Sequence, residues 1–468
     1  MLFNSYTFAV FFVVLFALDR AIGHWPTRKG LLLLASYLFY AAWNPLYIFI
    51  LGGSTGLDWW LARALDRAEG LRLRKALLIL SLVANLGLLA FFKYWTLFMD
   101  GLAALLGIGQ PHALPRHDLL LPVGISFYTF ASLSYTIDVY RRKVRADASL
   151  PDYALFVSFF PHLVAGPIVR AYQFLPQLRA PRRATAAQVE WGLTLLILGL
   201  FSKAVMADFL FAPVVDTVFA DPGRFGTIEA LAGVIAFSGQ IYYDFAGYSL
   251  CAIGLALCFG FEFPDNFRYP YAAIGLRDFW RRWHISLSTW IRDYLYFPLG
   301  GSRSGPWRNG CNLLITMTLA GLWHGASPMF LLWGLLHGAY LAAERELTAR
   351  CPIPATGLLP VLGMLLTVVL VTLTWIPFRA PDLATMFGIL AALSAHDVTL
   401  KLDALTLLGV YLGFSATLVW QWRWREGSPE LAFGHLRTIP RATLLGVCLL
   451  LIFLCSGGDE RTFIYFQF

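Results

Sequence analysis

The chain has 468 residues, of which 58% are hydrophobic and only 14% are charged. Soluble domains carry about 25% charged residues, so 36 basic and 28 acidic side chains are too few to cover a surface that faces water. A surface that faces lipid needs almost none. The composition therefore excludes a soluble protein and predicts an all-α polytopic membrane protein.

The formal net charge of +8 does not indicate nucleic-acid binding. The basic residues cluster in short loops between apolar runs, where the positive-inside bias places them, and they form no extended basic domain. The six cysteines show no CxxC or other metal-ligand spacing. We therefore expect no metal site and no tightly bound cofactor.

The N-terminal part contains apolar runs that are separated by basic loops. We expect spans at residues 6–22, 31–51, 76–99 and 119–140. Asn44 and Pro45 interrupt the second run, so that run forms either one kinked span or two shorter pieces. Residues 155–169 are too short for a full span and contain two prolines, which predicts a re-entrant or broken helix.

The C-terminal part contains a polar, aromatic and basic stretch between two groups of apolar runs. We expect apolar segments at residues 189–220, 228–261, 311–341, 358–377, 405–420 and 444–455. Residues 264–306 interleave arginine with tryptophan. This composition predicts amphipathic helices in the membrane interface, with arginine toward headgroups or an acidic ligand and tryptophan at the hydrocarbon boundary.

His324 is the strongest candidate for a functional residue. It lies in Gly321-Leu322-Trp323-His324-Gly325, inside a run otherwise suited to lipid, and ionisable side chains in membrane segments are costly and typically functional. The two glycines permit close backbone approach around an imidazole that accepts a proton near neutral pH. The alternative is a buried histidine that a neighbouring carbonyl group satisfies.

His284 is the second candidate. If residues 277–288 form one helix, a single face holds Arg277, Arg281, His284 and Ser288, with Trp280 at its edge. A histidine there orients a base, contacts a thioester or caps an interfacial helix. For His162 and His337, which also lie in apolar segments, packing or hydrogen bonding between helices is the favoured interpretation.

Three further charged residues are candidates for contacts to a substrate or donor. Asp244 follows Tyr243 in an apolar run and forms either a polar patch near the active site or a hydrogen-bond clip between helices. Arg281 and Arg282 suit either the phosphates of a donor such as coenzyme A or lipid headgroups.

The motifs together resemble those of the membrane-bound O-acyltransferase family. The run RDFWRRWHISLSTWIRDYLY at residues 277–296 is followed by PLGGSR, NLLITMTLAGLWHGA and WGLLHG. Further matches are SYLFYAAWN, FFKYW, LPVGISFYTFASLSYTIDVYR, FPHLVAGPIVR and FIYFQF. Within the family the sequence is most similar to the bacterial alginate O-acetyltransferase branch, although Leu250 stands where that branch usually has Asp.

The resemblance implies a fold of roughly 10–12 transmembrane helices, with re-entrant and interfacial helices around a central tunnel. It implies one integral-membrane domain over residues 1–468, with N-terminal helices at 1–150, a catalytic core at about 151–345 and C-terminal helices at 346–468. His324 would act as general base toward the hydroxyl that attacks an acyl thioester, and His284 would help to position donor or acceptor. Trp323 or a backbone N–H near Gly325 is a candidate oxyanion donor.

The resemblance also implies a cellular context. In the bacterial inner membrane, acetyl-CoA or a carrier-protein thioester would supply the acetyl group from the cytoplasm. A periplasmic SGNH-type partner would then pass it to an exported polysaccharide such as alginate. Cellulose, peptidoglycan and teichoic acid are alternative acceptors. A transporter and a structural scaffold are alternatives of another class; the lack of an internal sequence repeat argues against the transporter, and two embedded histidines argue against the scaffold.

Overall fold

The computed structural model describes residues 1–106, 121–303, 305–350, 357–427, 433, 436–456 and 461–464, and these residues form helices and loops without a β-strand. The chain groups into two compact units, one of residues 1–193 with 252–264 and one of residues 194–251 with 265–468. The all-helical architecture confirms the expected fold class. The division into three consecutive parts stays a prediction.

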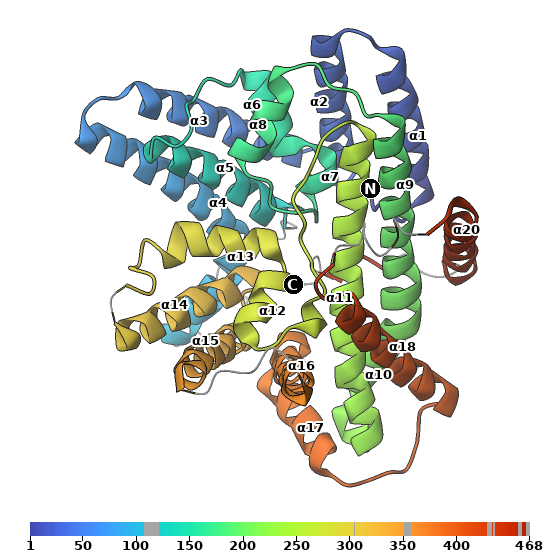
Figure 1. Cartoon of the computed structure of the whole chain (residues 1–468). Coiled ribbons are helices and arrows are strands. Elements are labelled where there is room, and N and C mark those ends of the chain that lie inside the picture. Colours follow the sequence, from blue (N-terminus) through green and yellow to red (C-terminus); the bar gives the residue numbers. More distant parts are fainter. Residues whose placement is uncertain are drawn as a thin grey trace. The chain divides into compact units, whose positions relative to one another are not determined.

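The first unit is built from eight complete helices of the described chain and the ends of two others (Figure 1). The complete helices are α1 (Tyr6–Ala21), α2 (Trp25–Ala41), α3 (Tyr47–Arg67), α4 (Leu71–Leu105), α5 (Ile125–Tyr140), α6 (Leu150–Ser158), α7 (Phe160–Leu163) and α8 (Ala171–Arg179). The shared helices are α9 (Ala186–Phe201) and α11 (Thr227–Cys258).

Two predicted interruptions are present in the first unit. The chain leaves α2 before Asn44 and Pro45 and enters α3 after them, so the run at residues 31–51 forms two pieces. The segment at residues 155–169 is also broken, because α6 ends at Ser158 and α7 has only four residues. The start of the expected span at 119–140, residues 119 and 120, lies outside the described residues.

His162 lies at this break and packs against aromatic rings. It is buried, and its ring centroid lies 5.3 Å from that of Phe263, 6.1 Å from that of Phe174 and 6.3 Å from that of Phe159. These contacts confirm the packing interpretation of His162.

The second unit contains the remaining helices. In chain order these are η2 (Ser202–Phe211), α10 (Ala212–Ala220), η3 (Pro222–Arg224), η4 (Pro270–Ala272), α12 (Leu276–Arg282), α13 (Ile285–Ile291), η5 (Arg292–Tyr296), α14 (Pro306–His324), α15 (Pro328–Arg350), α16 (Leu358–Arg379), α17 (Leu383–Ser394), α18 (Ala404–Arg423) and α20 (Thr438–Cys455). The η2 segment is a π-helix, a form that is frequent at functional sites.

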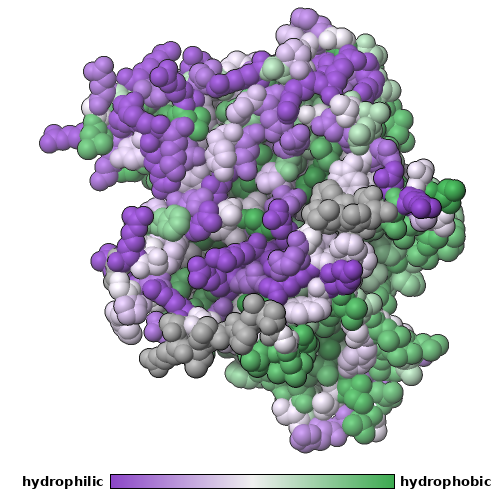
Figure 2. Space-filling model, viewed as in Figure 1, coloured by the Kyte–Doolittle hydropathy of each residue, from purple (hydrophilic) through white to green (hydrophobic). Residues whose placement is uncertain are grey.

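Six stretches of the described chain are long and apolar enough to cross a membrane. They are residues Leu71–Leu105, Ala186–Ala220, Thr227–Cys258, Leu358–Arg379, Ala404–Arg423 and Thr438–Cys455. The other described helices do not meet both criteria of length and apolarity; α1, for example, has only 16 residues. The larger count of roughly 10–12 spans therefore stays a prediction. Figure 2 shows hydrophobic side chains over α20 and hydrophilic ones over α12.

The stretch at residues 264–306 differs from its prediction. It forms short helices, and the chain breaks between α12 and α13, so the expected single helix over residues 277–288 is wrong. The break occurs because His284 adopts a left-handed conformation with φ 43° and Ile285 N–H donates to Asn266 O at 2.9 Å. Trp283 and Trp290 are buried, so these two rings pack inside the protein rather than at its surface.

Candidate active site

The second unit places His324 at the C-terminal end of α14, where a close helix pair turns back into α15. The two helices approach tightly because glycines face the partner backbone. A Cβ on Gly321 would lie 2.2 Å from Phe330 O, and one on Gly334 would lie 2.3 Å from Met317 O. The sequence expectation of close backbone approach beside His324 is confirmed at Gly321. A short loop then leads from His324 into α15.

His324 is surrounded by aromatic rings. Its side chain is buried, and its ring lies edge-on to Trp333 and Phe378, each at a centroid distance of 5.1 Å. Phe330 lies 6.4 Å away. These rings keep water from the imidazole, and a dry site strengthens the electrostatic interactions of a proton-transfer step.

Trp323 contacts both candidate histidines. Its ring centroid lies 4.9 Å from that of His324 and 6.3 Å from that of His284. Three residues that the sequence singled out are therefore brought together, although His284 and His324 lie forty positions apart in the chain. The arrangement is two buried imidazoles joined through one indole ring.

His284 is oriented by a polar network that the sequence did not indicate. Asn266 Oδ1 lies 3.1 Å from His284 Nδ1 and accepts from Ser286 Oγ at 2.8 Å and from Ser286 N–H at 3.3 Å. Asn266 Nδ2 donates to Ser249 Oγ at 3.0 Å. A backbone N–H can only donate, so the Asn266 atom that faces Ser286 and His284 is the oxygen.

This network sets the tautomer of His284. Because Asn266 Oδ1 accepts, Nδ1 of His284 carries the hydrogen, and the lone pair of the neutral ring lies on Nε2. Within the described chain, Nε2 has no hydrogen-bond partner. Burial lowers the pKa of His284, which lies outside the six candidate spans, to about 3. His284 is therefore neutral at neutral pH and offers Nε2 as an acceptor.

His337 has a structural environment beside this pair. Its Nε2 pairs with Thr374 Oγ1 at 2.9 Å, and its Nδ1 accepts from Trp280 Nε1 at 3.3 Å. The interpretation of His337 as a hydrogen bond between helices is confirmed. Trp280 is engaged by this bond and lies against Trp333 at a centroid distance of 5.8 Å.

Asp244 and Tyr243 bind to other parts of the second unit. Asp244 forms an ion pair with Lys203 at 3.0 Å and accepts from Ile464 N–H at 2.9 Å. The hydroxyl group of Tyr243 pairs with Thr417 Oγ1 at 2.8 Å. These contacts agree with a clip between helices, and substrate contacts of Asp244 and Tyr243 stay a prediction.

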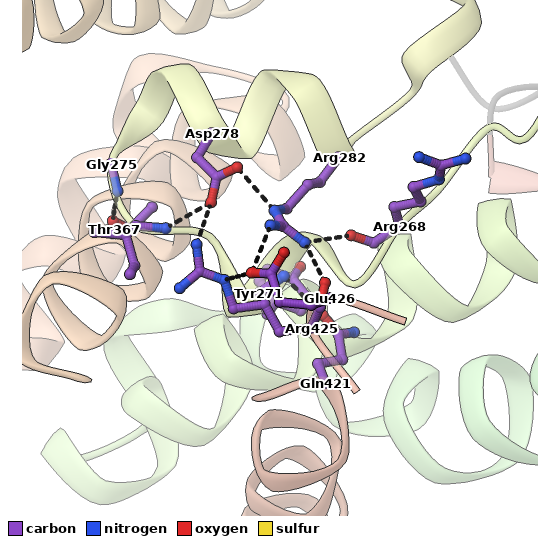
Figure 3. A network of polar contacts seen from close by, with 10 residues as sticks. Arg268, Tyr271, Gly275, Asp278, Arg282, Thr367, Gln421, Arg425 and Glu426 are labelled. Carbon is purple, nitrogen blue, oxygen red and sulfur yellow. Dashed lines mark hydrogen bonds and ion pairs between the residues drawn. The ribbon is translucent and has the colours of Figure 1, made fainter. Parts of the chain in front are cut away.

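Arg282 belongs to a charge network that fastens α12 (Figure 3). Arg282 Nε donates to Asp278 Oδ1 at 2.9 Å, and Arg425 Nη2 donates to the second oxygen of the same carboxylate at 3.1 Å. Arg282 Nη1 also donates to Arg425 O at 2.8 Å. Asp278 therefore offsets much of the positive charge with which Arg282 would bind a phosphate. Arg281 is exposed, and Ser288 Oγ donates to Trp283 O at 3.1 Å.

Sequence reasoning missed three residues of this region. Asn266 lies in a loop and carried no signal, because its partner His284 is eighteen positions away. Phe245, whose ring lies 4.6 Å from that of His284, is a phenylalanine in an apolar run and cannot be told from an ordinary core residue in the sequence. Lys203 did carry a signal, since it is a lone lysine in an apolar run, and such residues are functional candidates by default.

The sequence comparisons define the class of protein. Residues 129–377, more than half of the chain, match the profile of the membrane-bound O-acyltransferase family. The chain therefore belongs to this family, and it is a multi-pass membrane O-acyltransferase.

Individual relatives cover most of the chain. It is 40% identical to the probable alginate O-acetylase AlgI of Pseudomonas aeruginosa over 88% of this chain and 79% of the relative. It is 36% identical to the probable alginate O-acetylase AlgI of Pseudomonas putida, with 100% of both chains covered. It is 35% identical to the peptidoglycan O-acetyltransferase of Helicobacter pylori over 77% of this chain and 72% of that one.

Proposed function

We propose that this enzyme transfers acetyl groups for the O-acetylation of an exported polysaccharide, with alginate as the first candidate. The relatives named as alginate O-acetylases support alginate as the acceptor, because their similarity extends over most or all of this chain. The observation that carries the chemistry is the buried His324, enclosed by aromatic rings and linked through Trp323 to His284. Peptidoglycan is the second candidate acceptor, since one relative is named for it.

The proposed reaction uses His324 as the general base. Its imidazole takes the proton of the acceptor hydroxyl as the oxygen attacks the carbonyl carbon of an acetyl thioester. A carbon–oxygen bond forms, the carbon–sulfur bond breaks, and the thiolate leaves with the proton from the imidazolium. The surrounding rings exclude water, which would otherwise compete as the nucleophile.

The other proposed residues act around this step. His284 presents the Nε2 lone pair toward donor or acceptor, and Trp323 is a candidate oxyanion donor. Of Arg281 and Arg282, Arg281 is the exposed one and is therefore the better placed to meet a donor phosphate. Roles in substrate or donor binding are also proposed for Trp280, Tyr243, Asp244, Arg282 and Ser288.

The cellular context is part of the proposal. A cytoplasmic thioester, acetyl-CoA or an acylated carrier protein, supplies the acetyl group, and the enzyme resides in the bacterial inner membrane around a central tunnel. A periplasmic SGNH-type partner receives the group on the other face and modifies the exported polymer. The chain supplies the membrane half of this system.

The proposal is tested by the variant His324→Ala. A lost general base costs about 10²–10⁴ in rate, so we expect the O-acetyl content of the native polymer to fall at least a hundredfold per amount of protein in the membrane. The matched control is His24→Ala, which removes an exposed histidine and leaves acetylation unchanged. Normal acetylation by His324→Ala at normal membrane levels would refute the catalytic role.

The donor is tested with purified protein and radiolabelled acetyl-CoA, with and without the partner. Thiol release together with labelled partner supports direct transfer from acetyl-CoA. Label on the partner only when an acetylated carrier protein replaces acetyl-CoA identifies the carrier as the donor. Passage of intact acetyl-CoA into vesicles without thiol release would contradict acyl transfer.

A further inference from the structure

The segment of residues 461–464 enters the core of the second unit with Phe463 and Ile464, although it is far from His284 and His324 in sequence. Phe463 is 0% exposed and Ile464 is 2% exposed. A short segment without a long helix or strand of its own is normally at a surface. Its burial therefore needs partners, and two sets of contacts supply them.

The first set is polar and fixes the backbone of the segment. Ile464 N–H donates to Asp244 Oδ2 at 2.9 Å, and Lys203 Nζ donates to Thr462 O at 3.3 Å. Lys203 also forms ion pairs with Asp244 at 3.0 Å and with Asp208 at 2.9 Å. Lys203 on η2 thus pairs with two carboxylates, and Lys203 and Asp244 each form a further hydrogen bond to this segment.

A second charge cluster holds the start of the segment. Arg461 Nη1 pairs with Asp216 Oδ2 at 2.5 Å, and Arg379 Nη2 pairs with the other oxygen of Asp216 at 3.1 Å. Asp216 lies on α10 and Arg379 ends α16. Polar contacts therefore hold residues 461–464 at both ends, and this arrangement fixes the position of the phenylalanine between them.

The second set of contacts is aromatic and leads to the candidate active site. The Phe463 ring lies 4.6 Å from Tyr248 and 5.6 Å from Phe245. Phe245 lies edge-on to His284, at 4.6 Å and 87°. Asn266 holds His284 on its Nδ1 side, Phe245 packs against the His284 ring, and Phe463 packs against Phe245.

We propose that residues 461–464 are a positioning element of the active site, in which Phe463 holds Phe245 against His284. Lys203 and Asp244 act as the anchor of this element. The element touches no reacting atom and acts through the orientation of the imidazole. This inference rests on the proposed function, in which His284 takes part in acetyl transfer.

The central test is Phe463→Ala. Loss of the ring leaves a cavity beside Phe245, so His284 spends less time in its productive orientation, and small displacements of catalytic groups reduce turnover strongly. We expect the maximal rate of acetyl transfer in membrane vesicles to fall about tenfold or more, while the half-saturating donor concentration stays within about twofold. Phe463→Leu, which refills much of the cavity, should restore at least half of the O-acetyl content of the polymer in cells.

A matched control separates positioning from a general loss of packing. Phe39→Ala deletes the same ring from a buried position of the first unit. Polymer O-acetyl content is normalised to folded protein in the membrane, so that variants that fold less are compared fairly. If Phe463→Ala and Phe39→Ala both keep full activity per folded protein, or lose it equally, the positioning role is wrong.

Two further variants make the failure of each proposal distinguishable. If His284→Ala keeps full activity, the proposed role of His284 fails, and this inference falls with it. If His284→Ala is inactive while Phe463→Ala is fully active, only this inference falls. The anchor is tested separately with Asp244→Ala, for which we expect faster trypsin cleavage after Arg461; an unchanged cleavage rate would overturn the anchoring by Asp244.

Discussion

At the scale of single residues, the candidate site depends on how His284 is held. The ring is buried, its pKa is lowered to about 3 by burial, and Asn266 selects the tautomer. The ring is thus a neutral acceptor at the pH of a cell without assistance from a nearby charge. Asn266, which contacts the Nδ1 side of the ring, decides which nitrogen of His284 carries the lone pair.

The role of Asn266 is open to a direct test. Asn266→Ala removes the acceptor of Nδ1, so His284 populates both tautomers, and we expect acetyl transfer to fall about tenfold, or roughly 1.4 kcal/mol in activation free energy. Asn266→Asp keeps an oxygen at the same place and should retain more activity than the alanine variant. The measurement is polymer O-acetyl content per membrane protein, and equal losses in the two variants would argue against tautomer control.

The sequence predicted some of these residues and not others, for physical reasons. His324 and its neighbour Trp323 could be found because a histidine in an apolar run is energetically costly, and such a histidine is recognisable from the sequence alone. Asn266 could not be found, because an amide in a loop is ordinary until the fold brings it to an imidazole. Phe463 belonged to a recognised motif, but its contact with Phe245 depends on tertiary structure alone.

At the scale of elements, the close packing of α14 against α15 depends on glycines, which have no side chain. Gly321 lies so close to Phe330 O that a methyl group cannot fit without moving a helix backbone, whereas Gly310 on the same helix has only Ala342 Cβ within 4 Å, at 3.9 Å. Small residues at such positions are what allow membrane helices to pack closely. The loop that follows His324 therefore depends on this contact.

This contrast gives a prediction for the helix pair. Gly321→Ala should force α14 and α15 apart, displace His324 and lower both thermal stability in detergent and acetylation, with about 1–3 kcal/mol lost to overpacking. Gly310→Ala should be neutral or slightly stabilising, because alanine favours a helix over glycine. Stability is followed by thermal unfolding of the purified protein, and similar unfolding temperatures for the two variants would contradict the close contact.

The break between α12 and α13 marks the limit of periodicity as a guide to elements. Spacing places Arg281, His284 and Ser288 on one helical face, but the structure turns the chain at His284. Residues spaced by three or four positions share a face only within one continuous helix, and no local sequence pattern predicted that His284 would be left-handed. The interruption at Pro45 was predictable, because proline removes a backbone donor wherever it occurs.

At the scale of the whole molecule, the small number of charged residues was sufficient to predict that much of the surface faces lipid. Apolar side chains remain exposed on α20, such as Val447 and Leu450, and a protein with such surfaces is stable only in lipid. The same composition could not predict how many segments cross, because short and broken helices escape any criterion of length. The fold class was therefore accessible from sequence, whereas the exact set of spans was not.

The lipid-facing surface leads to a prediction about insertion. Val447→Lys places an ammonium group near the middle of α20, where the cost is about 2.5–3.5 kcal/mol, so we expect a reduced fraction of α20 to insert. Ile439→Lys, near the start of the same helix, lets the side chain reach the interface and should insert normally. Accessibility mapping of residues that flank α20 measures the inserted fraction, and equal insertion of the two variants would place α20 outside the hydrocarbon.

The contact between Asp244 and Ile464 joins residues that are synthesised at different times. Ribosomes add about 5–20 residues per second, so Phe463 is made on the order of ten seconds after His324. During this interval Lys203 and Asp244 can neutralise each other, but the support beneath Phe245 does not yet exist. If the proposed positioning holds, the nascent enzyme carries His284 before the support for its ring has been made, and we expect full activity only once synthesis has delivered residues 461–464.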